Sequence, residues 1–503
     1  MELISIQTAI LVILAVFAVR FLPKKARDIV LAALTVYVLY KNNSIVNFLI
    51  TLAILAAIYG AGNLIAKGRR GRLISCLAVI GLVAGMIFWK YSGFFINIIN
   101  SVTNLAGKQS CLSETAITSP FGISYVFLIL ISYVLGVYWG LTEPVRNIFC
   151  FVHTVAFFPL WNMGPIPGAE DLKNEGEPCV TYDSLRSGFC RILWGIFKKL
   201  VIAERCAVIV NEIYGNLAQY GGLYVFLGTL LFVLQLYAEF SGAMDIVLGI
   251  AEMIGKKLPE NFDRPFSAVT ISDFWRRWHI TLGEWLRNFV LYPILKSGLF
   301  QKYGAWLKKH FGKKTSKKVV TYTGLFISWF LIGLWHGNNW SYIFGVGIYY
   351  WILIVASELA QPLFGKMCAL LHINKKSRGY LVFARVRTLL LFTFGTVFFR
   401  SGSMAVAMEA LSAMVHSFRL SILWDGSLLN LGLEPAELGI LALGVLLMYL
   451  VSKIQEKESV SAWLAARKTA VRWAVVYGLI FGVLIFGCYG LDFEAASFIY
   501  QGF

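Results

Sequence analysis

The stretch Phe274–Leu282 reads FWRRWHITL and places two tryptophans, two arginines and a histidine inside an otherwise apolar sequence. A second stretch, Gly333–Gly337, reads GLWHG and again sets a histidine beside a tryptophan. A lysine-rich segment lies between the two. His279 and His336 are therefore the first candidates for catalytic residues.

The composition is typical of a polytopic membrane protein. Of the 503 residues, 58% are hydrophobic and only 14% are charged, and the mean hydropathy is +0.70, far from the balance of a soluble domain. Apolar runs of about 17 to 25 residues, long enough to cross a ~30 Å hydrocarbon layer, recur along the chain. We expect an all-α protein with about twelve transmembrane helices, near residues 4–22, 27–41, 46–66, 73–96, 122–141, 189–214, 223–251, 319–336, 340–360, 381–399, 436–452 and 473–490.

The basic residues predict the topology. The net charge of +18 is spread over short segments between the apolar runs, which argues against a nucleic-acid partner and for a lipid bilayer as the partner. Lysine and arginine accumulate in cytoplasmic loops. With twelve crossings, the main basic segments fall on the cytoplasmic side and both termini face outside. These segments are Lys24–Arg27, Lys67–Arg72, Lys256–Lys257, Lys302–Lys318 and Lys453–Arg472.

Residues 273–289 are predicted to form one amphipathic helix in the plane of the cytoplasmic interface. At about 100° per residue, the apolar and polar side chains separate onto two faces. His279 lies on the apolar face, so its imidazole is expected to point into the protein; a packed histidine is the structural alternative to a functional one. The apolar face holds Trp275, Trp278, His279, Leu282, Trp285, Leu286 and Phe289, and the polar face holds Asp273, Arg276, Arg277, Thr281, Glu284, Arg287 and Asn288.

Two segments are predicted to interrupt regular helix at membrane depth. Residues 146–168 contain three prolines and two glycines, and proline breaks helical hydrogen bonding. Irregular backbone is tolerated there when it lines a cavity in the protein, so we expect re-entrant segments. His336 closes an apolar run and precedes the polar residues Gly337–Asn339. Ionisable residues in membrane segments are functional candidates, and a structural kink is the alternative at His336.

A buried histidine can act as a general base, for example in acyl transfer to a hydroxyl. A neutral imidazole takes the alcohol proton while the oxygen attacks a thioester carbonyl, and burial keeps the imidazole neutral. We assign this role to His336. A donor to the developing oxyanion is also needed, and His279, Asn338 and Asn339 are all candidates.

Other catalytic sets are absent from the sequence. It contains no GxSxG elbow, no HExxH pair and no Walker A motif, and the histidines and cysteines lack metal-ligand spacing, so no metal site is predicted. Glu239 and Asp245 are carboxylates in an apolar segment and are compatible with a proton-coupled transporter. Lining of a substrate route and a helix-packing salt bridge are equally open for them.

Several ordered motifs resemble those of the membrane-bound O-acyltransferase (MBOAT) family, in the wording of its bacterial members. The resemblance covers at least residues 120–405. It includes FFP at 157–159, GPI at 164–166, EFSG at 239–242, PENFDRPF at 259–266, FWRRWHITL at 274–282, WLRN at 285–288, GLWHGNNW at 333–340 and FFR at 398–400.

The resemblance implies a single integral membrane domain over residues 1–503, with N-terminal helices in 1–120, the MBOAT core in 121–405 and C-terminal helices in 406–503. It implies a helical bundle enclosing a central tunnel, with His336 as the essential residue and His279 as its supporting partner. The cytoplasmic donor is expected to enter beside residues 273–289. The residues expected to contact substrate are Trp275, Arg276, Arg277, Trp278, Trp335, Asn338 and Asn339.

Within the family, the motifs are similar to those of alginate O-acetyltransferase membrane subunits and, next, of D-alanyl-teichoic acid transfer proteins. No tightly bound cofactor is expected, and the acyl donor is a thioester, either acetyl-coenzyme A or an acyl-carrier protein. The segment Lys302–Lys318 is read as a solvated loop near anionic lipid, or as a dock for an acidic carrier protein. An extracytoplasmic acyltransferase or polymer-modifying protein is the expected outer partner.

The sequence therefore predicts a membrane O-acyltransferase that passes an acyl group, foremost acetyl, to a hydroxyl of an exported cell-surface polysaccharide or partner protein. D-alanyl transfer to teichoic acid is the alternative within the same class. A small-substrate transporter would show pseudo-symmetric halves, and a non-catalytic scaffold would work without His336.

Overall fold

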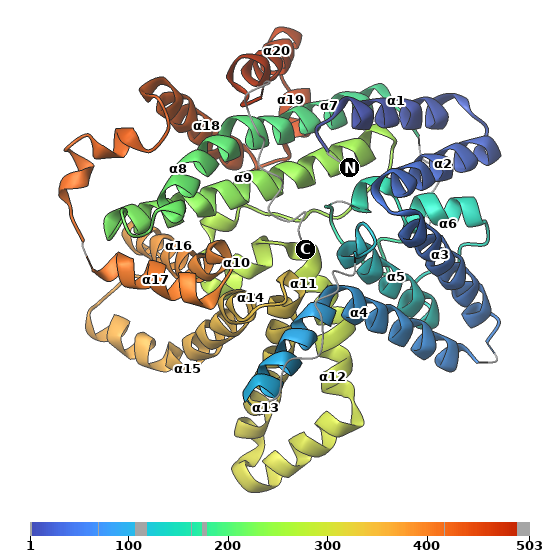
Figure 1. Ribbon diagram of the computed structural model, residues 1–503, viewed down its shortest axis with the longest axis horizontal. Helices are drawn as coiled ribbons and strands as arrows, with labels where there is room; N and C mark the ends of the chain where they lie inside the picture. Colours follow the sequence, from blue (N-terminus) through green and yellow to red (C-terminus); the bar gives the residue numbers. More distant parts are fainter. Residues whose placement is uncertain are drawn as a thin grey trace. The chain divides into compact units, whose positions relative to one another are not determined.

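The computed structural model is helical throughout the residues it describes, which are 3–68, 70–105, 118–161, 163–173, 179–416 and 418–489 (Figure 1). Within these ranges the one β-type pairing recorded is an isolated bridge between Phe262 and Trp278. The all-α prediction is confirmed for the described chain. The last residue of the predicted span 473–490, and parts of the predicted segments 1–120 and 406–503, lie outside the described residues.

Eight helical runs of the described chain are long and apolar enough to cross a membrane, so the chain is a multi-pass membrane protein. The three apolar helices α1 (Ile6–Phe21), α5 (Ile123–Tyr138) and α17 (Met404–Val415) are shorter. The eight runs are α3 (Ile45–Ala66), α4 (Gly71–Leu105), α9 (Leu223–Met253), α13 (Gly298–His336), the run Trp340–Leu370, α16 (Arg378–Ser401), α18 (Pro435–Ile454) and α20 (Thr469–Phe486).

The predicted count of twelve crossings exceeds these eight runs. Of the other four predicted spans, 4–22 and 122–141 correspond to α1 and α5, which have 16 residues each. The predicted span 27–41 lies in α2 (Lys24–Asn42), whose first turns carry Lys24, Lys25, Arg27 and Asp28. The span 189–214 is divided among three helical segments. These four segments therefore differ from the eight long apolar runs. Two are shorter, one has a charged start, and one is divided.

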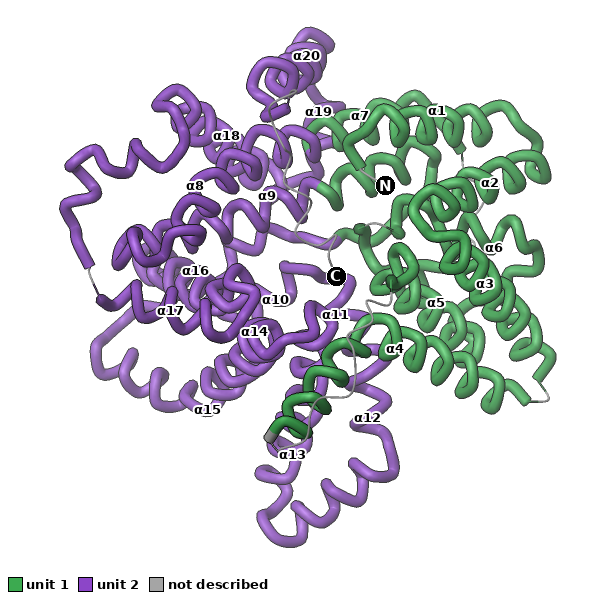
Figure 2. Tube along the Cα trace, in the orientation of Figure 1, with its two compact units in different colours: residues 1–194, 243–260 green, residues 195–242, 261–503 purple. Residues whose placement is uncertain are grey.

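The described helices pack into two compact units, coloured separately in Figure 2. Unit 1 comprises residues 1–194 and 243–260, and unit 2 comprises residues 195–242 and 261–503. The helices α7 (Tyr182–Phe197) and α9 each contribute to both units. The prediction of one membrane domain over residues 1–503 stays a prediction.

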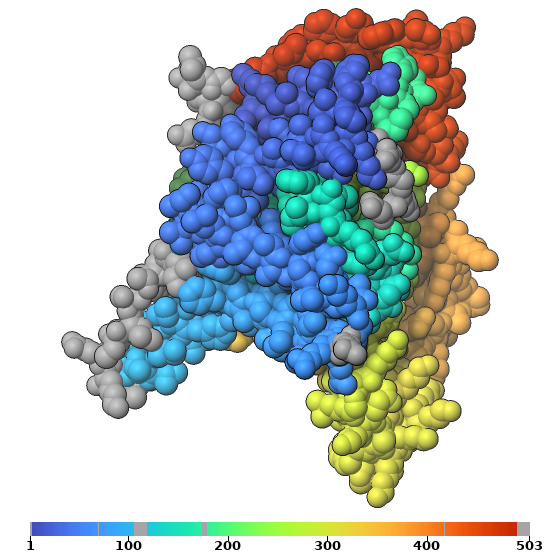
Figure 3. All heavy atoms as spheres, turned by 90° about the vertical axis from the view of Figure 1, so that its right-hand side faces the viewer, coloured from blue at the N-terminus to red at the C-terminus, as the bar shows by residue number. Residues whose placement is uncertain are grey.

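Unit 1 is built from α1 to α6 and the segments that follow them. Helix α2 packs on α6 (Ile148–Val155), and α3, α4 and α5 pack on one another. In Figure 3 the atoms of the first residues of this unit are drawn in blue and form much of the surface that faces the viewer. Leu73, Leu77 and Ile80 of α4 are exposed on its surface, as expected for side chains that face lipid.

The predicted interruption in residues 146–168 is confirmed in unit 1. Helix α6 ends after eight residues, a short 3₁₀ helix, η1 (Phe158–Trp161), follows, and residues 163–168 have no regular secondary structure. Residues 163–167 are buried. Proline at 165 and 167 removes backbone donors from this stretch, and the surrounding helices cover it.

In unit 1, Arg191 of α7 joins three carboxylates. Its guanidinium bonds to Asp245 at 3.0 Å, Glu252 at 2.7 Å and Glu260 at 2.6 Å. Asp245 is therefore part of a salt bridge between helices, which was one of the alternatives for it in the sequence.

Unit 2 contains the remaining helices and three short π-helices, η2 (Lys198–Ala203), η4 (Arg287–Leu291) and η5 (Ile343–Ile348). The described elements not yet bounded are α8 (Glu204–Gly215), η3 (Pro265–Ser267), α10 (Ile271–Arg277), α11 (Ile280–Leu286), α12 (Tyr292–Lys296), α14 (Trp340–Tyr342), α15 (Tyr349–Leu370), η6 (Ser421–Leu423), η7 (Ser427–Asn430) and α19 (Val460–Ala465). Helix α13 packs on η5, and η5 in turn packs on α16.

Four charged residues of the predicted span 189–214, Lys198, Lys199, Glu204 and Arg205, are buried in unit 2 and have partners. Lys199 lies 2.8 Å from Glu204 and 3.6 Å from Glu239, and Lys198 donates to the hydroxyl of Ser241 at 2.8 Å. Arg205 donates to the carbonyl of Phe486 at 2.7 Å. Buried charges require such partners, so Glu239, like Asp245, takes part in a salt bridge.

The prediction of a loop over Lys302–Lys318 is wrong. These residues belong to α13, which is helical on both sides of Gly312. Gly312 has φ +80°, which glycine adopts without steric cost, and the chain changes direction there. Ser316 then donates to the carbonyl of Gly304 at 2.7 Å and joins the two arms. Lysine is a good helix former, so a run of lysines does not by itself predict a loop.

Candidate functional site

His279 and His336 lie close together in unit 2, although they come from separate elements. His336 is the last residue of α13, and His279 is the residue before α11. Both side chains are buried, with each residue 3% exposed. The centroids of the two imidazole rings are 6.5 Å apart. The structure therefore brings together the two residues that the sequence selected as catalytic candidates.

His336 is positioned by close packing between α13 and η5. A Cβ atom on Gly333 would lie 2.8 Å from Cα and from the carbonyl oxygen of Ile343, and one on Gly347 would lie 2.6 Å from the carbonyl oxygen of Trp329. These are backbone atoms and cannot move aside. Glycine at both positions lets the two backbones approach, one turn before His336.

The prediction of a single amphipathic helix over residues 273–289 is wrong. The segment is divided into α10, α11 and η4, and His279 has φ +48° and ψ +50° between the first two. Most of the predicted apolar face is nevertheless buried, including Trp278, Leu282 and Trp285. The exception on the polar face is Thr281, which is 2% exposed because it bonds to Asn261.

Asn261 holds the turn at His279. Its backbone carbonyl accepts the N–H of Ile280 at 3.0 Å, and its side-chain oxygen accepts the N–H of Thr281 at 3.2 Å and the Thr281 hydroxyl at 3.0 Å. The neighbouring bridge between Phe262 and Trp278 continues this pairing. Asn261 is fully buried, so its hydrogen bonds form away from water and fix the turn.

The same oxygen of Asn261 defines the tautomer of His279. The Nδ1 atom of His279 lies 3.2 Å from it. Because that oxygen already accepts a backbone N–H, it is the amide's acceptor end, and Nδ1 has to donate. Burial lowers the pKa of His279 to about 3. The imidazole is therefore neutral near pH 7, with the proton on Nδ1 and a lone pair on Nε2.

Aromatic rings surround both histidines. Trp335 lies 4.9 Å from the ring of His336 and 5.9 Å from that of His279. Phe240 packs on His279 at 4.9 Å, and Phe399 on His336 at 5.9 Å. Such a site has a low local dielectric, in which neutral imidazoles are favoured and hydrogen bonds to a reacting group are strengthened.

The four residues expected to bind substrate before His279 have different surroundings. Trp278 stacks on Phe274, with ring centroids 5.6 Å apart, and is part of the core. Arg277 bonds to Asp273 at 3.0 Å and to Asp263 at 3.2 Å, so its charge is neutralised locally. Arg276 is exposed and, with Trp275, lines a pocket of about 530 Å³ that also includes Ile280, Glu284, Arg287 and Tyr292.

The two asparagines after His336 also differ. Asn338 is exposed. The side chain of Asn339 accepts the N–H of Tyr342 at 3.2 Å, which caps α14, and donates to the carbonyl of Gly402 at 2.7 Å. Asn339 thus has a clear structural role at the turn between α13 and α14.

The sequence analysis did not select Asn261 or Phe399 as site residues. Both lie in quoted motifs, PENFDRPF and FFR, and membership of a motif was the available signal. Their contacts with the histidines depend on tertiary packing, which no spacing rule in the sequence reports.

Comparison with known proteins gives several relatives of similar size. The chain is 32% identical over 380 residues to the probable alginate O-acetylase of Pseudomonas syringae pv. tomato, covering 74% of this chain and 67% of the relative. It is 30% identical to the protein of the same name in Pseudomonas aeruginosa, covering 76% and 68%. It is 28% identical over 249 residues to the teichoic acid D-alanyltransferase of Bacillus subtilis, covering 47% and 58%. No family model matches the chain.

Proposed function

The chain belongs to the membrane-bound O-acyltransferase family, and we propose that it transfers an acetyl group from a cytoplasmic thioester donor to a hydroxyl of an exported cell-surface polysaccharide. The observation that carries this proposal is the buried pair His279–His336, with ring centroids 6.5 Å apart. The relatives named as acetylases, at 30% and 32% identity, support acetyl as the acyl group.

In the proposed reaction, His336 takes the proton of the acceptor hydroxyl as its oxygen attacks the thioester carbonyl. The carbon–sulfur bond then breaks, and the proton passes to the leaving thiolate. A positioned general base of this kind accelerates a reaction by about 10² to 10⁴-fold.

We propose that His279 accepts a hydrogen bond and does not donate one to the oxyanion. With its proton on Nδ1 and bonded to Asn261, the neutral ring cannot donate to an oxyanion through Nε2. It can accept a hydrogen bond there, from a substrate hydroxyl or a bridging water, and so align the acceptor towards His336. Asn338 and the second N–H of the Asn339 amide remain as proposed oxyanion donors.

The donor is proposed to be acetyl-coenzyme A or an acyl-carrier protein, entering beside α10 and α11 through a tunnel to the histidines. The pocket at Arg276 and Arg287 supports an anionic group on that side. The outer partner is proposed to be an extracytoplasmic acyltransferase or polymer-modifying protein. The enzyme is proposed to lie in a bacterial plasma membrane with both termini outside.

The test measures alkali-released acetate and D-alanine from cell envelopes carrying the intact protein, His336→Ala, His279→Ala or His310→Ala. His310 is exposed on α13 and serves as the matched control. We expect acetate to fall by about 10²-fold or more in His336→Ala, to fall in His279→Ala, and to stay unchanged in His310→Ala. Protein amount and melting temperature are checked in each.

The outcomes separate the alternatives. Loss of D-alanine instead of acetate moves the protein to teichoic acid D-alanylation with the same histidines. Retention of both groups in a folded His336→Ala protein contradicts catalysis by His336 and favours a scaffold. A transporter is not favoured by the described structure, because the carboxylates Glu239 and Asp245 are both engaged in salt bridges.

A further inference from the structure

A cavity of about 380 Å³ lies within unit 1. His279 and His336 belong to unit 2 and do not line it. Its walls come from the start of α2, from α6 and η1, from residues 167–173, and from the turn after α9, residues 254–258. The volume falls in the range of about 300 to 1,000 Å³ that is usual for small-molecule sites.

The charged lining of this cavity is predominantly basic. Five basic and two acidic side chains reach it, a formal excess of three positive charges with histidine neutral. The basic residues are Lys24, Arg27, Lys173, Lys256 and Lys257, and the acidic residues are Asp28 and Asp171. Lys24 and Lys256–Lys257 come from two segments that the sequence placed on the cytoplasmic side, and the fold brings them to one cavity.

Both carboxylates already have partners. Asp171 accepts the backbone N–H of Gly168 at 2.8 Å. Asp28 lies 3.1 Å from Nε2 of His153 and 3.7 Å from Nε of Arg27. The acidic groups therefore stabilise the walls of the cavity, and the lining keeps its formal excess of positive charge.

Lys256 is held in place at the wall. Its ammonium donates to the carbonyl of Thr154 at 2.9 Å and lies 4.5 Å from the ring centroid of Phe157. Burial lowers the pKa of Lys256 to about 7, since desolvation opposes the charged form. An anion in the cavity would stabilise that form.

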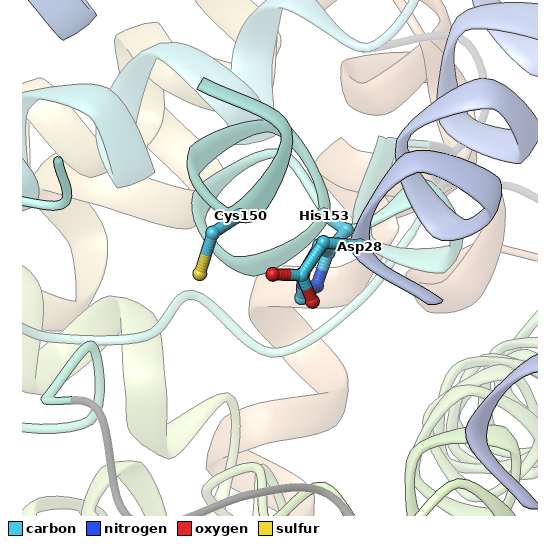
Figure 4. Close-up of side chains that lie close together, drawn as sticks. All are labelled: Asp28, Cys150 and His153. Carbon is cyan, nitrogen blue, oxygen red and sulfur yellow. The ribbon is translucent and has the colours of Figure 1, made fainter. Parts of the chain in front are cut away.

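The same cavity contains a possible metal-ligand set, drawn in Figure 4. The ligand atoms of Asp28, Cys150 and His153 lie within 4.8 Å of one another. A divalent cation there would have to compete with Arg27 for Asp28, and it would lie among five basic side chains. Unlike charges attract and like charges repel, so the excess of basic side chains favours an anion over a cation.

We propose that this cavity binds the phosphate group of a small organic phosphate or of a phospholipid headgroup. Lysine and arginine are the usual phosphate ligands in proteins, and Phe157, Phe158 and Leu31 supply an apolar wall for the rest of the molecule. The proposal does not depend on acyl transfer, because it is tested by binding.

The experiment uses the full chain purified in detergent, with radiolabelled pyrophosphate and glycerol 3-phosphate in equilibrium dialysis at constant ionic strength. A parallel arm measures thermal unfolding in phosphatidylcholine nanodiscs with and without phosphatidylglycerol. The variants are Lys24→Gln and Lys257→Gln, both at exposed positions, and the matched control is Lys25→Gln. Lys25 is exposed beside Lys24 on α2 but does not line the cavity.

We expect saturable binding of the phosphate probe to the unaltered protein. The affinity should fall about tenfold in Lys24→Gln and in Lys257→Gln, since one charge-assisted hydrogen bond contributes about that factor. The affinity should be unchanged in Lys25→Gln. Binding of the soluble probes identifies a small organic phosphate, and stabilisation by phosphatidylglycerol alone, lost in the same variants, identifies a lipid headgroup. Equal behaviour of Lys24→Gln and Lys25→Gln, or no saturable effect of any probe, overturns the proposal. So does zinc binding that is lost in His153→Ala when no phosphate binds.

Discussion

His279 has a left-handed backbone conformation, which costs a residue other than glycine about 1 to 3 kcal/mol. The hydrogen bonds from Ile280 and Thr281 to Asn261 offset that cost. The same asparagine directs the proton of His279 to Nδ1. A single buried side chain thus controls the backbone, the ring orientation and the tautomer of a proposed active-site residue.

We predict that Asn261→Leu lowers both stability and activity. It leaves the buried donors of His279 and Thr281 without their acceptor, which should cost about 1 to 3 kcal/mol of unfolding free energy. Acyl transfer should fall at least tenfold in kcat with little change in KM, because the orientation of His279 is lost. Thermal melting in detergent and kinetics with the purified enzyme are the measurements.

Asn261→Asp tests whether orientation is the cause. A carboxylate keeps the acceptor oxygen, so position and most of the stability should return. The negative charge of the aspartate should raise the pKa of His279. When the pH is lowered, the variant should therefore lose activity at a higher pH than the unaltered protein does. If the aspartate and leucine variants are equally inactive with the same pH profile, Asn261 does not act through His279. Asn288→Leu, at an exposed position, is the control for loss of an amide.

At the scale of elements, residues 271–296 show what periodicity can and cannot report. Over residues 273–289, helical spacing correctly indicated most of the buried side chains, with Thr281 as the exception on the polar face, because burial of apolar area drives the segment onto the core. It did not indicate the break at His279, since the hydrogen bonds that stabilise the break come from Asn261, outside the segment. The turn is a tertiary feature that local pattern does not encode.

The contact between α13 and η5 gives a prediction at this scale. Gly333→Ala should destabilise the protein by about 1 to 3 kcal/mol, because the added methyl group would overlap the backbone of Ile343 and force the elements apart. Gly365→Ala is the matched control, since a Cβ there has no neighbour within 4 Å. That change should be neutral or stabilise by up to about 1 kcal/mol, as alanine is favoured over glycine in helices.

Melting temperature and acyl transfer are measured for both glycine variants. We expect Gly333→Ala to lose activity as well as stability, because His336 lies one turn further along α13. Equal melting temperatures for the two variants would show that α13 and η5 do not pack as closely as the structure has them.

At the scale of the whole molecule, the topology rests on charge. The positive-inside rule places the basic segments on the cytoplasmic side. Within unit 1, Lys24 and Lys256 line the same cavity, which agrees with a common side for those two segments. The eight long apolar runs establish a multi-pass protein, while the number of crossings and the side of each terminus stay predictions.

We predict that single cysteines placed at Lys25, Lys314 and Lys457, in a version lacking the native cysteines, react with a membrane-impermeant thiol reagent in inverted vesicles and not in intact cells. All three positions are exposed and belong to the predicted cytoplasmic segments. A cysteine added beyond residue 503 should react in intact cells. Labelling of the three lysine positions from opposite sides would contradict the twelve-crossing topology.

The sequence by itself determined the class of the protein, its apolar helices and the two histidines, because hydrophobic runs and ordered motifs are local properties of a chain. It also gave the family, which the similarity to known relatives confirmed. Three features could be seen only in the tertiary structure. His279 and His336 lie close together, Asn261 sets the tautomer of His279, and the buried charges of η2 and α8 are paired. Packing between elements brings the rings of His279 and His336 to 6.5 Å, places Asn261 at 3.2 Å from His279, and sets Glu239 beside Lys199, and no local pattern reports these contacts.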